Sequence, residues 1–164
     1  MATFVVENKE YSLSEIYQFL RKRPQVKLSD EVIDQINASR KVLDDSVKSG
    51  KVIYGVNTGF GKLSQITIPS DNISKLQKNL ILSHAVGVGD PVENDIVRLI
   101  ILLKVISLSK GFSGIRLKVV QRLVELLNND CLPIIPSQGS VGASGDLAPL
   151  AHMTLPIIGI GDVI

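Results

Sequence analysis

The sequence predicts a mainly helical domain in which short strands and loops connect the helices. Three observations predict this class. Five segments carry apolar residues at helical spacing between start and stop signals, and the alternating runs typical of strands are short. In addition, 45% of the 164 residues are apolar and 21% are charged, which is typical of a globular chain and excludes a disordered one.

The N-terminal part of the chain predicts a strand followed by a helix. Residues 3–7 alternate between apolar and polar side chains, and we expect them to form a small hairpin with the residues around Tyr11. Ser12 and Glu15 then form a capping-box pattern, so a helix is expected from there to Pro24.

Four further helices are expected along the chain. They are placed at residues 29–49, from about 70 to 87, from Asp90-Pro91 through 96–108, and at about 113–127. The segment 96–108 is apolar nearly all round, which is typical of a buried helix or a membrane span. Arg98 and Lys104 interrupt it well short of the ~20 residues that a span needs, so burial is the prediction.

The last part of the chain predicts an extended run, a loop and an interrupted apolar segment. Residues 132–135 lie between prolines, and a Gly- and Ser-rich loop follows at 137–146. The apolar segment 147–158 is expected to be broken by Pro149 and Pro156.

Composition excludes several classes of function. The formal net charge is +2 and no segment gathers Lys and Arg, so a nucleic-acid partner is not expected. Cys131 is the single cysteine, and the two histidines lie 68 positions apart, so no metal site is expected. The N-terminal residues lack the pattern of a secretory signal, and we expect a cytoplasmic protein without a membrane partner.

Ala143-Ser144-Gly145, between Gly142 and Asp146, has the residue types that backbone cyclisation needs. The amide nitrogen of Gly145 can attack the carbonyl carbon of Ala143, because the flanking groups are small and glycine adopts unusual dihedral angles without steric cost. Loss of two water molecules would leave an exocyclic methylidene, which is an electrophile. Most Ala-Ser-Gly triplets are plain turns, so the surrounding sequence has to show whether this one forms a cofactor.

Four segments, in order, resemble one family. They read YGVNTGFG (54–61), LSHAVGVG (82–89), SLSKGFSGIR (107–116) and GSVGASGDLAPLAHM (139–153). Together they resemble the aromatic amino acid ammonia-lyases, and within that family the members that act on histidine. The resemblance covers about residues 13–161.

The resemblance implies a fold, a cofactor and a reaction. The fold is the N-terminal helical domain of the aromatic amino acid lyases and their fumarase- and aspartase-like superfamily, in this chain a single domain over 1–164 that carries the cofactor-forming loop. Ala143, Ser144 and Gly145 would form a 4-methylidene-imidazol-5-one group autocatalytically, without an external cofactor. L-Histidine would be the substrate, and ammonia and trans-urocanate the products, in histidine degradation.

The resemblance also assigns roles to individual residues. Tyr54 matches the tyrosine that removes the substrate proton, and His84 the residue that contacts the substrate side chain. Asp146, Asn57 and Gly61 would support the site. The structural alternatives are a tyrosine hydroxyl tied to backbone, a histidine satisfied near a helix end, and an aspartate that caps the following helix.

Three other polar residues, in these segments or next to them, stay without an assigned role. Arg116 and Gln138 have two possible roles, structural pairing and binding of the substrate carboxylate, and we favour structural pairing. His152 is expected to be packed in the core rather than catalytic.

Members of the family are much longer than 164 residues, and the resemblance implies that a long central helical bundle is absent from this chain. In the family, further site residues come from that bundle and from neighbouring subunits of a homotetramer. We therefore expect this chain to be the N-terminal part of an enzyme and to be inactive alone. The alternatives are a tyrosine or phenylalanine lyase or aminomutase, and a remnant domain that acts as an interaction module.

Overall fold

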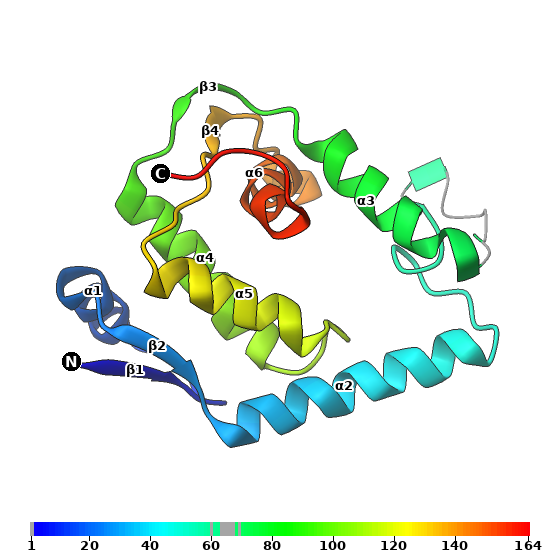
Figure 1. The fold of residues 1–164 in the computed structure, drawn as a ribbon, viewed down its shortest axis with the longest axis horizontal. Coiled ribbons are helices and arrows are strands. Elements are labelled where there is room, and N and C mark those ends of the chain that lie inside the picture. The colour runs from blue at the N-terminus through cyan, green and yellow to red at the C-terminus, as the bar shows by residue number, and fades with distance from the viewer. Residues whose placement is uncertain (1, 60, 63–67, 69) are drawn as a thin grey trace.

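A computed structural model describes residues 2–59, 61–62, 68 and 70–164 and shows a mainly helical fold (Figure 1). The α-helices are α1 (Leu13–Lys22), α2 (Asp30–Lys48), α3 (Ile73–His84), α4 (Asn94–Ser109), α5 (Leu117–Asn128) and α6 (Leu147–Thr154). The 3-10 helices are η2 (Ser70–Asn72), η3 (Gly142–Ser144) and η4 (Leu155–Ile158). The strands are β1 (Thr3–Val6), β2 (Gln25–Leu28), β3 (Val88–Pro91) and β4 (Pro136–Gln138). Within the part of the chain that the structure describes, no helix is long and apolar enough to cross a membrane.

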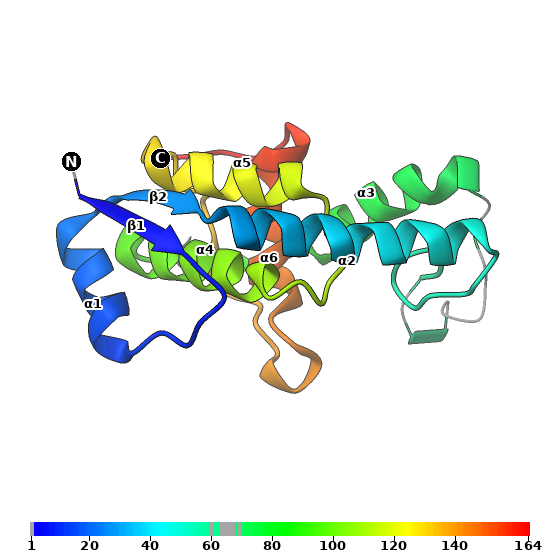
Figure 2. The same ribbon diagram turned by 90° about the horizontal axis from the view of Figure 1, so that it is seen from below.

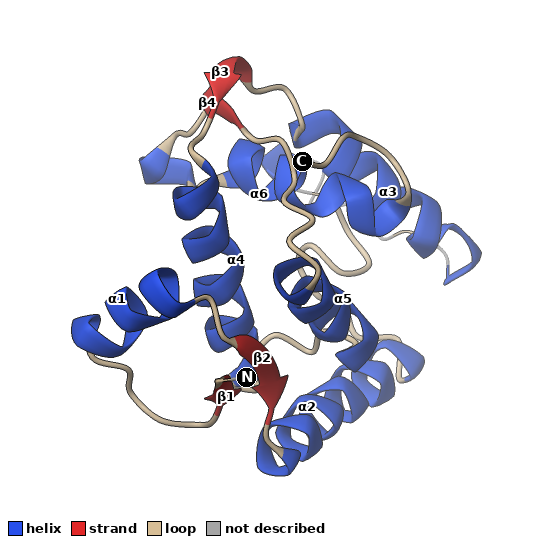
Figure 3. Ribbon diagram, turned by 60° about the vertical axis from the view of Figure 1, so that its left-hand side comes forward, coloured by secondary structure: helices blue, strands red, loops and turns tan. Residues whose placement is uncertain are grey.

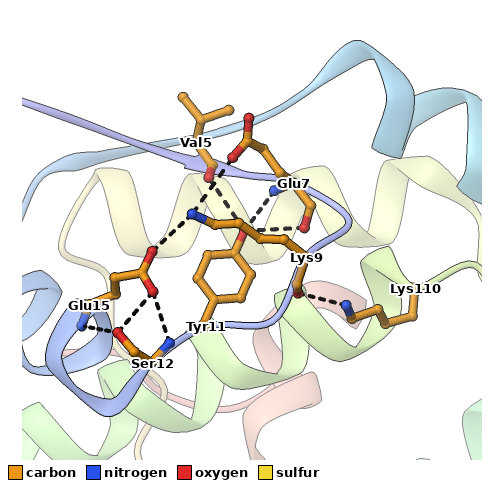
Figure 4. A network of polar contacts seen from close by, with 7 residues as sticks. All are labelled: Val5, Glu7, Lys9, Tyr11, Ser12, Glu15 and Lys110. Atoms are coloured by element: carbon orange, nitrogen blue, oxygen red, sulfur yellow. Dashed lines mark hydrogen bonds and ion pairs between the residues drawn. The ribbon is translucent and has the colours of Figure 1, made fainter.

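The predicted N-terminal hairpin is wrong, although the strand at its start is present. β1 pairs in parallel with β2, with Thr3 opposite Gln25, and α1 forms the crossover between them. Tyr11 does not extend a sheet. Its hydroxyl accepts the Glu7 N–H at 2.7 Å and its ring stacks on Phe4, so it packs against the end of β1 from the side (Figure 4).

The predicted helix starts at α1 and α2 are confirmed. The Ser12 hydroxyl accepts the Glu15 N–H at 3.2 Å, and the Glu15 carboxylate accepts the Ser12 N–H at 2.8 Å, which is a complete capping box. At α2, the Ser29 hydroxyl accepts the Val32 N–H at 3.3 Å. These bonds satisfy backbone donors that have no partner inside the helix.

The buried helix predicted at 96–108 is α4, and it forms the centre of the core. Val97, Ile101, Leu102 and Val105 are at most 1% exposed, and α4 packs against α1, α2, α5 and β1. The helix begins at Asn94 and not at Asp90-Pro91, because those two residues belong to β3. Its burial is therefore produced largely by elements of this chain.

Two boundaries near the C-terminal half also differ from the prediction. α5 begins at Leu117 rather than near 113, because Gly111 and Gly114 adopt positive φ angles in the preceding turn. α6 runs through Pro149, which stands at its third position, where a backbone N–H would lack an intrahelical partner in any case. Pro156 does end the regular helix, and the chain continues as η4.

The helices α3 and α6 form a second packed group beside this core, and β3 and β4 lie next to it (Figure 3). β3 pairs antiparallel with β4, so that Val88 lies opposite Gln138. This ladder joins the segment that follows α3 to the segment that leads into the Ala143-Ser144-Gly145 loop. The two parts of the chain that hold predicted site residues are thereby connected directly.

Candidate functional site

The Ala143-Ser144-Gly145 triplet lies on a tight turn at the tip of an exposed loop. The loop leaves β4, curls through η3 and enters α6, and it projects from the body of the molecule (orange in Figure 2). The Gly145 N–H donates to the Gly142 carbonyl at 3.2 Å, and Val141 and Gly145 form an isolated bridge. These contacts close the turn around the triplet.

The backbone at Gly145 suits ring formation in this turn. Gly145 has a φ of +84°, a conformation that favours glycine, and a Cβ built on it would meet no atom within 4 Å. Ala143 and Gly145 are exposed. The triplet therefore combines small residues, a closed turn and open space, and it fits the prosthetic group that its sequence implies.

Asp146 closes the base of the same loop. It occupies the N-cap position of α6, as the capping interpretation expects, but its side chain makes no capping hydrogen bond. Its carboxylate instead accepts the Ser140 hydroxyl. This contact joins the residue after the triplet to the start of the same loop.

Tyr54 lies in a turn that is fixed from inside by buried polar side chains. The side chain of Tyr54 is 63% exposed, and its hydroxyl accepts the Gly61 N–H at 3.4 Å. Asn57 is buried; its side-chain oxygen accepts the Ile53 N–H at 2.8 Å and its amide donates to the Lys51 carbonyl at 2.9 Å. In this structure Asn57 shapes the loop that presents Tyr54.

The glycine-rich loop after Tyr54 runs over residues 55–61, and residue 60 of it, like 63–67 and 69 beyond it, lies outside the described residues. The described part is attached to α3, because the Gln77 side-chain amide donates to the carbonyls of Gly55 and Val56 at 2.9 and 3.0 Å. Sequence reasoning did not single out Gln77. In the sequence, Gln77 is a glutamine in a helix that follows the Tyr54 segment. This pattern is too common to indicate a contact with that segment.

His84 is the last residue of α3 and is partly buried. Its Nδ1 lies 2.7 Å from the Leu80 carbonyl oxygen and 3.2 Å from the Ser83 hydroxyl. Because a carbonyl only accepts, Nδ1 carries the proton in the neutral ring, and Nε2 then bears the acceptor lone pair. The ring is thus oriented by its own helix end.

α3 relates the three predicted site segments to one another. The loop of Tyr54 is bound to its first half through Gln77, and His84 ends it. The residues after His84 pair with β4, which leads into the triplet loop. Of the residues left without a role, Arg116 takes the N-cap position of α5 and Gln138 lies in β4; both are exposed.

Metal ligands do not gather in the described part of the chain. Among the described residues, no group of three or more His, Cys, Asp or Glu side chains is arranged to hold a metal ion.

Comparison with known proteins places the chain in a family. The family model described as aromatic amino acid lyase matches residues 11–164, which is almost the whole chain. The chain belongs to the aromatic amino acid lyase family. It is 48% identical over 163 residues to the histidine ammonia-lyase of Idiomarina loihiensis, a match that covers 99% of this chain and 32% of that protein. The chain thus spans about a third of the length of the relatives that it matches.

Two solved structures share the fold of this family member. The ergothioneine-degrading enzyme ergothionase of Treponema denticola superimposes with a TM-score of 0.94 at 31% identity, over 98% of this chain and 32% of that one. The phenylalanine aminomutase of Pantoea agglomerans superimposes with a TM-score of 0.91 at 35% identity, over 100% of this chain and 31% of that one. The mainly helical fold with short strands therefore matches the corresponding part of aromatic amino acid lyase structures.

Proposed function

We propose that this chain is the N-terminal, electrophile-forming domain of an ammonia-lyase that converts L-histidine into trans-urocanate and ammonia. The observation that carries the proposal is the closed, exposed turn at Ala143-Ser144-Gly145 in a chain that is 48% identical to a histidine ammonia-lyase. The histidine ammonia-lyases of Idiomarina loihiensis and Salmonella paratyphi B are 48% and 49% identical to this chain. This similarity supports histidine as the substrate.

Ring closure would join the Gly145 nitrogen to the Ala143 carbonyl carbon, and the Ala143 oxygen would leave as water. A second water would take the Ser144 hydroxyl and one hydrogen of the Ser144 α-carbon. Asp146, which follows Gly145 in the chain and accepts the Ser140 hydroxyl, would accept and return protons in these steps. The finished 4-methylidene-imidazol-5-one supplies an electrophile that makes the substrate amine a better leaving group.

The other residues of the site would bind the substrate and move its proton. Tyr54 projects from its loop into solvent and would act as the base that removes the β-hydrogen. His84 would exchange hydrogen bonds with the substrate imidazole, because each neutral imidazole ring has one donor and one acceptor nitrogen. Residues from the rest of a longer chain and from other subunits of a homo-oligomer would complete the site.

A chimera tests this proposal, because the isolated chain is expected to be inactive. The matching N-terminal third of the Idiomarina loihiensis enzyme is replaced by residues 1–164 of this chain. We expect the chimera to form urocanate from L-histidine and its intact mass to be two water molecules below that of the unmodified chain. Ser144→Ala should abolish both, whereas Ser83→Ala, a change beside the site on α3, should keep the mass deficit.

Each alternative predicts a different product. Cinnamate, coumarate or a β-amino acid in place of urocanate would favour the other lyases or the aminomutases. A chimera that folds, keeps its full mass and forms no product would contradict the proposed function and favour an interaction module.

A further inference from the structure

A hydrogen bond ties the turn after His84 to the helix after the triplet. The Gly87 N–H donates to Nε2 of His152 at 3.0 Å, across 65 positions of sequence. Gly87 follows α3 by three residues, and His152 lies in α6, which begins two residues after Gly145. The bond therefore connects the end of α3 that carries His84 with the end of the loop that carries the triplet.

The bond defines the protonation state of His152. Nε2 can accept only while it lacks a proton, so the ring has to be neutral with its proton on Nδ1. His152 is partly buried, and burial lowers its pKa, which favours the same neutral form. The hydrogen bond and the burial of His152 therefore both favour the neutral imidazole.

The backbone at Gly87 packs closely against β4 and α6. A Cβ on Gly87 would lie 3.1 Å from His152 Nε2, 3.2 Å from the Gln138 carbonyl oxygen and 3.2 Å from Pro136 Cβ. A Cβ on Gly139 would in turn lie 3.0 Å from the Gly87 Cα. The turn is thus wedged between β4 and α6, and the hydrogen bond to His152 fastens it to α6.

We propose that His152 is a positioning residue that sets the place of His84 relative to the Ala143-Ser144-Gly145 loop. This role rests on the proposed function, whereas the contact itself does not. His152 acts through the Gly87 N–H, and it needs an acceptor atom at this point rather than a particular charge. The His152 side chain therefore acts as a hydrogen-bond acceptor that positions a neighbouring segment, in addition to packing.

The contact is tested by NMR on the ¹⁵N-labelled chain. Imidazole spectra should show His152 with Nε2 unprotonated and Nδ1 protonated. His152→Leu should speed amide exchange of Gly87 about tenfold, as the loss of one hydrogen bond does, and should shift the signals of His84 and Gly145. His152→Gln offers an oxygen acceptor, so its Gly87 exchange rate and its His84 and Gly145 signals should return most of the way to those of the unchanged chain.

Thr154→Val is the matched control on the same helix. Its hydroxyl donates to the Leu150 carbonyl at 2.7 Å within α6, so its loss should leave the Gly87 and His84 signals in place. In the chimera with the Idiomarina loihiensis enzyme, His152→Leu should lower kcat/KM for histidine about tenfold, with the two-water deficit kept, and His152→Gln should recover it.

The outcomes separate the two proposals. A protonated Nε2, or a His152→Leu variant that changes Gly87 and His84 no more than Thr154→Val does, overturns the positioning role whatever the chimera does. An inactive chimera with an unmodified triplet overturns the proposed function, and the NMR result then still decides whether His152 sets the position of His84.

Discussion

Glu15 is held in its ionised form at the start of α1. Its carboxylate accepts hydrogen bonds from Lys9 Nζ at 2.9 Å, from the Ser12 N–H at 2.8 Å and from the Ser12 hydroxyl at 2.9 Å (Figure 4). The bond from Lys9, followed by the two from Ser12, lowers the pKa of Glu15 from 4.5 to about 2. Lys9 also ion-pairs with Glu7, so the network joins α1 to the end of β1.

This lowered pKa predicts an acid-sensitive contribution to stability. Because the folded state binds the Glu15 proton less readily than the unfolded state, the contribution is complete above pH 4.5 and is lost as pH falls towards about 2. We expect Glu15→Gln to flatten the fall in unfolding free energy over that interval, measured by urea unfolding at each pH. Glu10→Gln, an exposed carboxylate outside this network, should keep the original slope.

Gly114 is required by its backbone conformation and by its contact with α2. Its φ is +61°, and a Cβ would lie 2.7 Å from Leu43 Cδ2 and 2.9 Å from Leu43 Cβ. Its N–H donates to the Ser39 hydroxyl at 3.0 Å, and its carbonyl accepts from Arg40 at 3.2 Å. These two hydrogen bonds fasten the turn before α5 to α2.

Gly114→Ala should lower the unfolding free energy by about 3 kcal/mol, because the new methyl group adds a steric clash to the cost of the positive φ. Gly50→Ala separates the two costs. Gly50 has a φ of +79° with no atom within 4 Å of an added Cβ, so we expect a loss of only about 1 kcal/mol. Equal losses for the two variants, measured by chemical denaturation, would show that the contact with Leu43 contributes nothing.

At the scale of elements, the contact between α6 and the turn after α3 predicts a second pH dependence. Burial lowers the pKa of His152 below 6.5, so the unfolded state binds its proton more readily than the folded state. Stability should then be complete above pH 6.5 and should decrease as pH falls below it. His152→Gln, which cannot titrate, should remove this step from a series of thermal unfolding curves, and an unchanged step would assign it to another group.

The elements that sequence reasoning predicted well are those with local signals. Ser12, Ser29 and Gly50 mark helix ends through bonds and dihedral angles within a few residues, and the structure places helix ends there. The pairing of β1 with β2 could not be predicted in the same way, because the alternation in β1 fixes which face is buried but not which strand is the partner. The helix break predicted at Pro149 was wrong, because a proline in the first turn of a helix does not interrupt it.

In the candidate site, too, local sequence features were predictable and contacts between distant segments were not. The triplet, Tyr54 and His84 were predicted because each lies in a contiguous motif. Gln77, which holds the Tyr54 loop, and the bond from Gly87 to His152 were not, since they join segments that only the fold brings together. Motifs thus indicated the groups proposed to react, and the structure added the contacts that hold them.

At the scale of the whole molecule, the chain exposes more surface than a compact protein of its mass. Its accessible surface is 10011 Å², whereas a compact monomer of 17.8 kDa exposes about 8000 Å². Part of the excess lies beside the candidate site, where Val86, Val88, Val141 and Leu147 are exposed apolar side chains on the segments around His84 and the triplet. This face has the character of a surface that other protein covers.

The isolated chain should therefore self-associate and bind an apolar dye through this face. We expect Val86→Ser combined with Val88→Ser to reduce dye binding and to shift sedimentation towards the monomer. Val42→Ser is the matched control, because Val42 on α2 is as exposed as Val86, at 67%, but lies away from the site. If all three proteins behave alike, the extra surface reflects only an open shape. If the site variant alone becomes monomeric, the apolar side chains next to His84 and the triplet form the face that the rest of a longer chain or a neighbouring subunit would bury, and an open, solvent-filled site would then account for the inactivity expected of the chain alone.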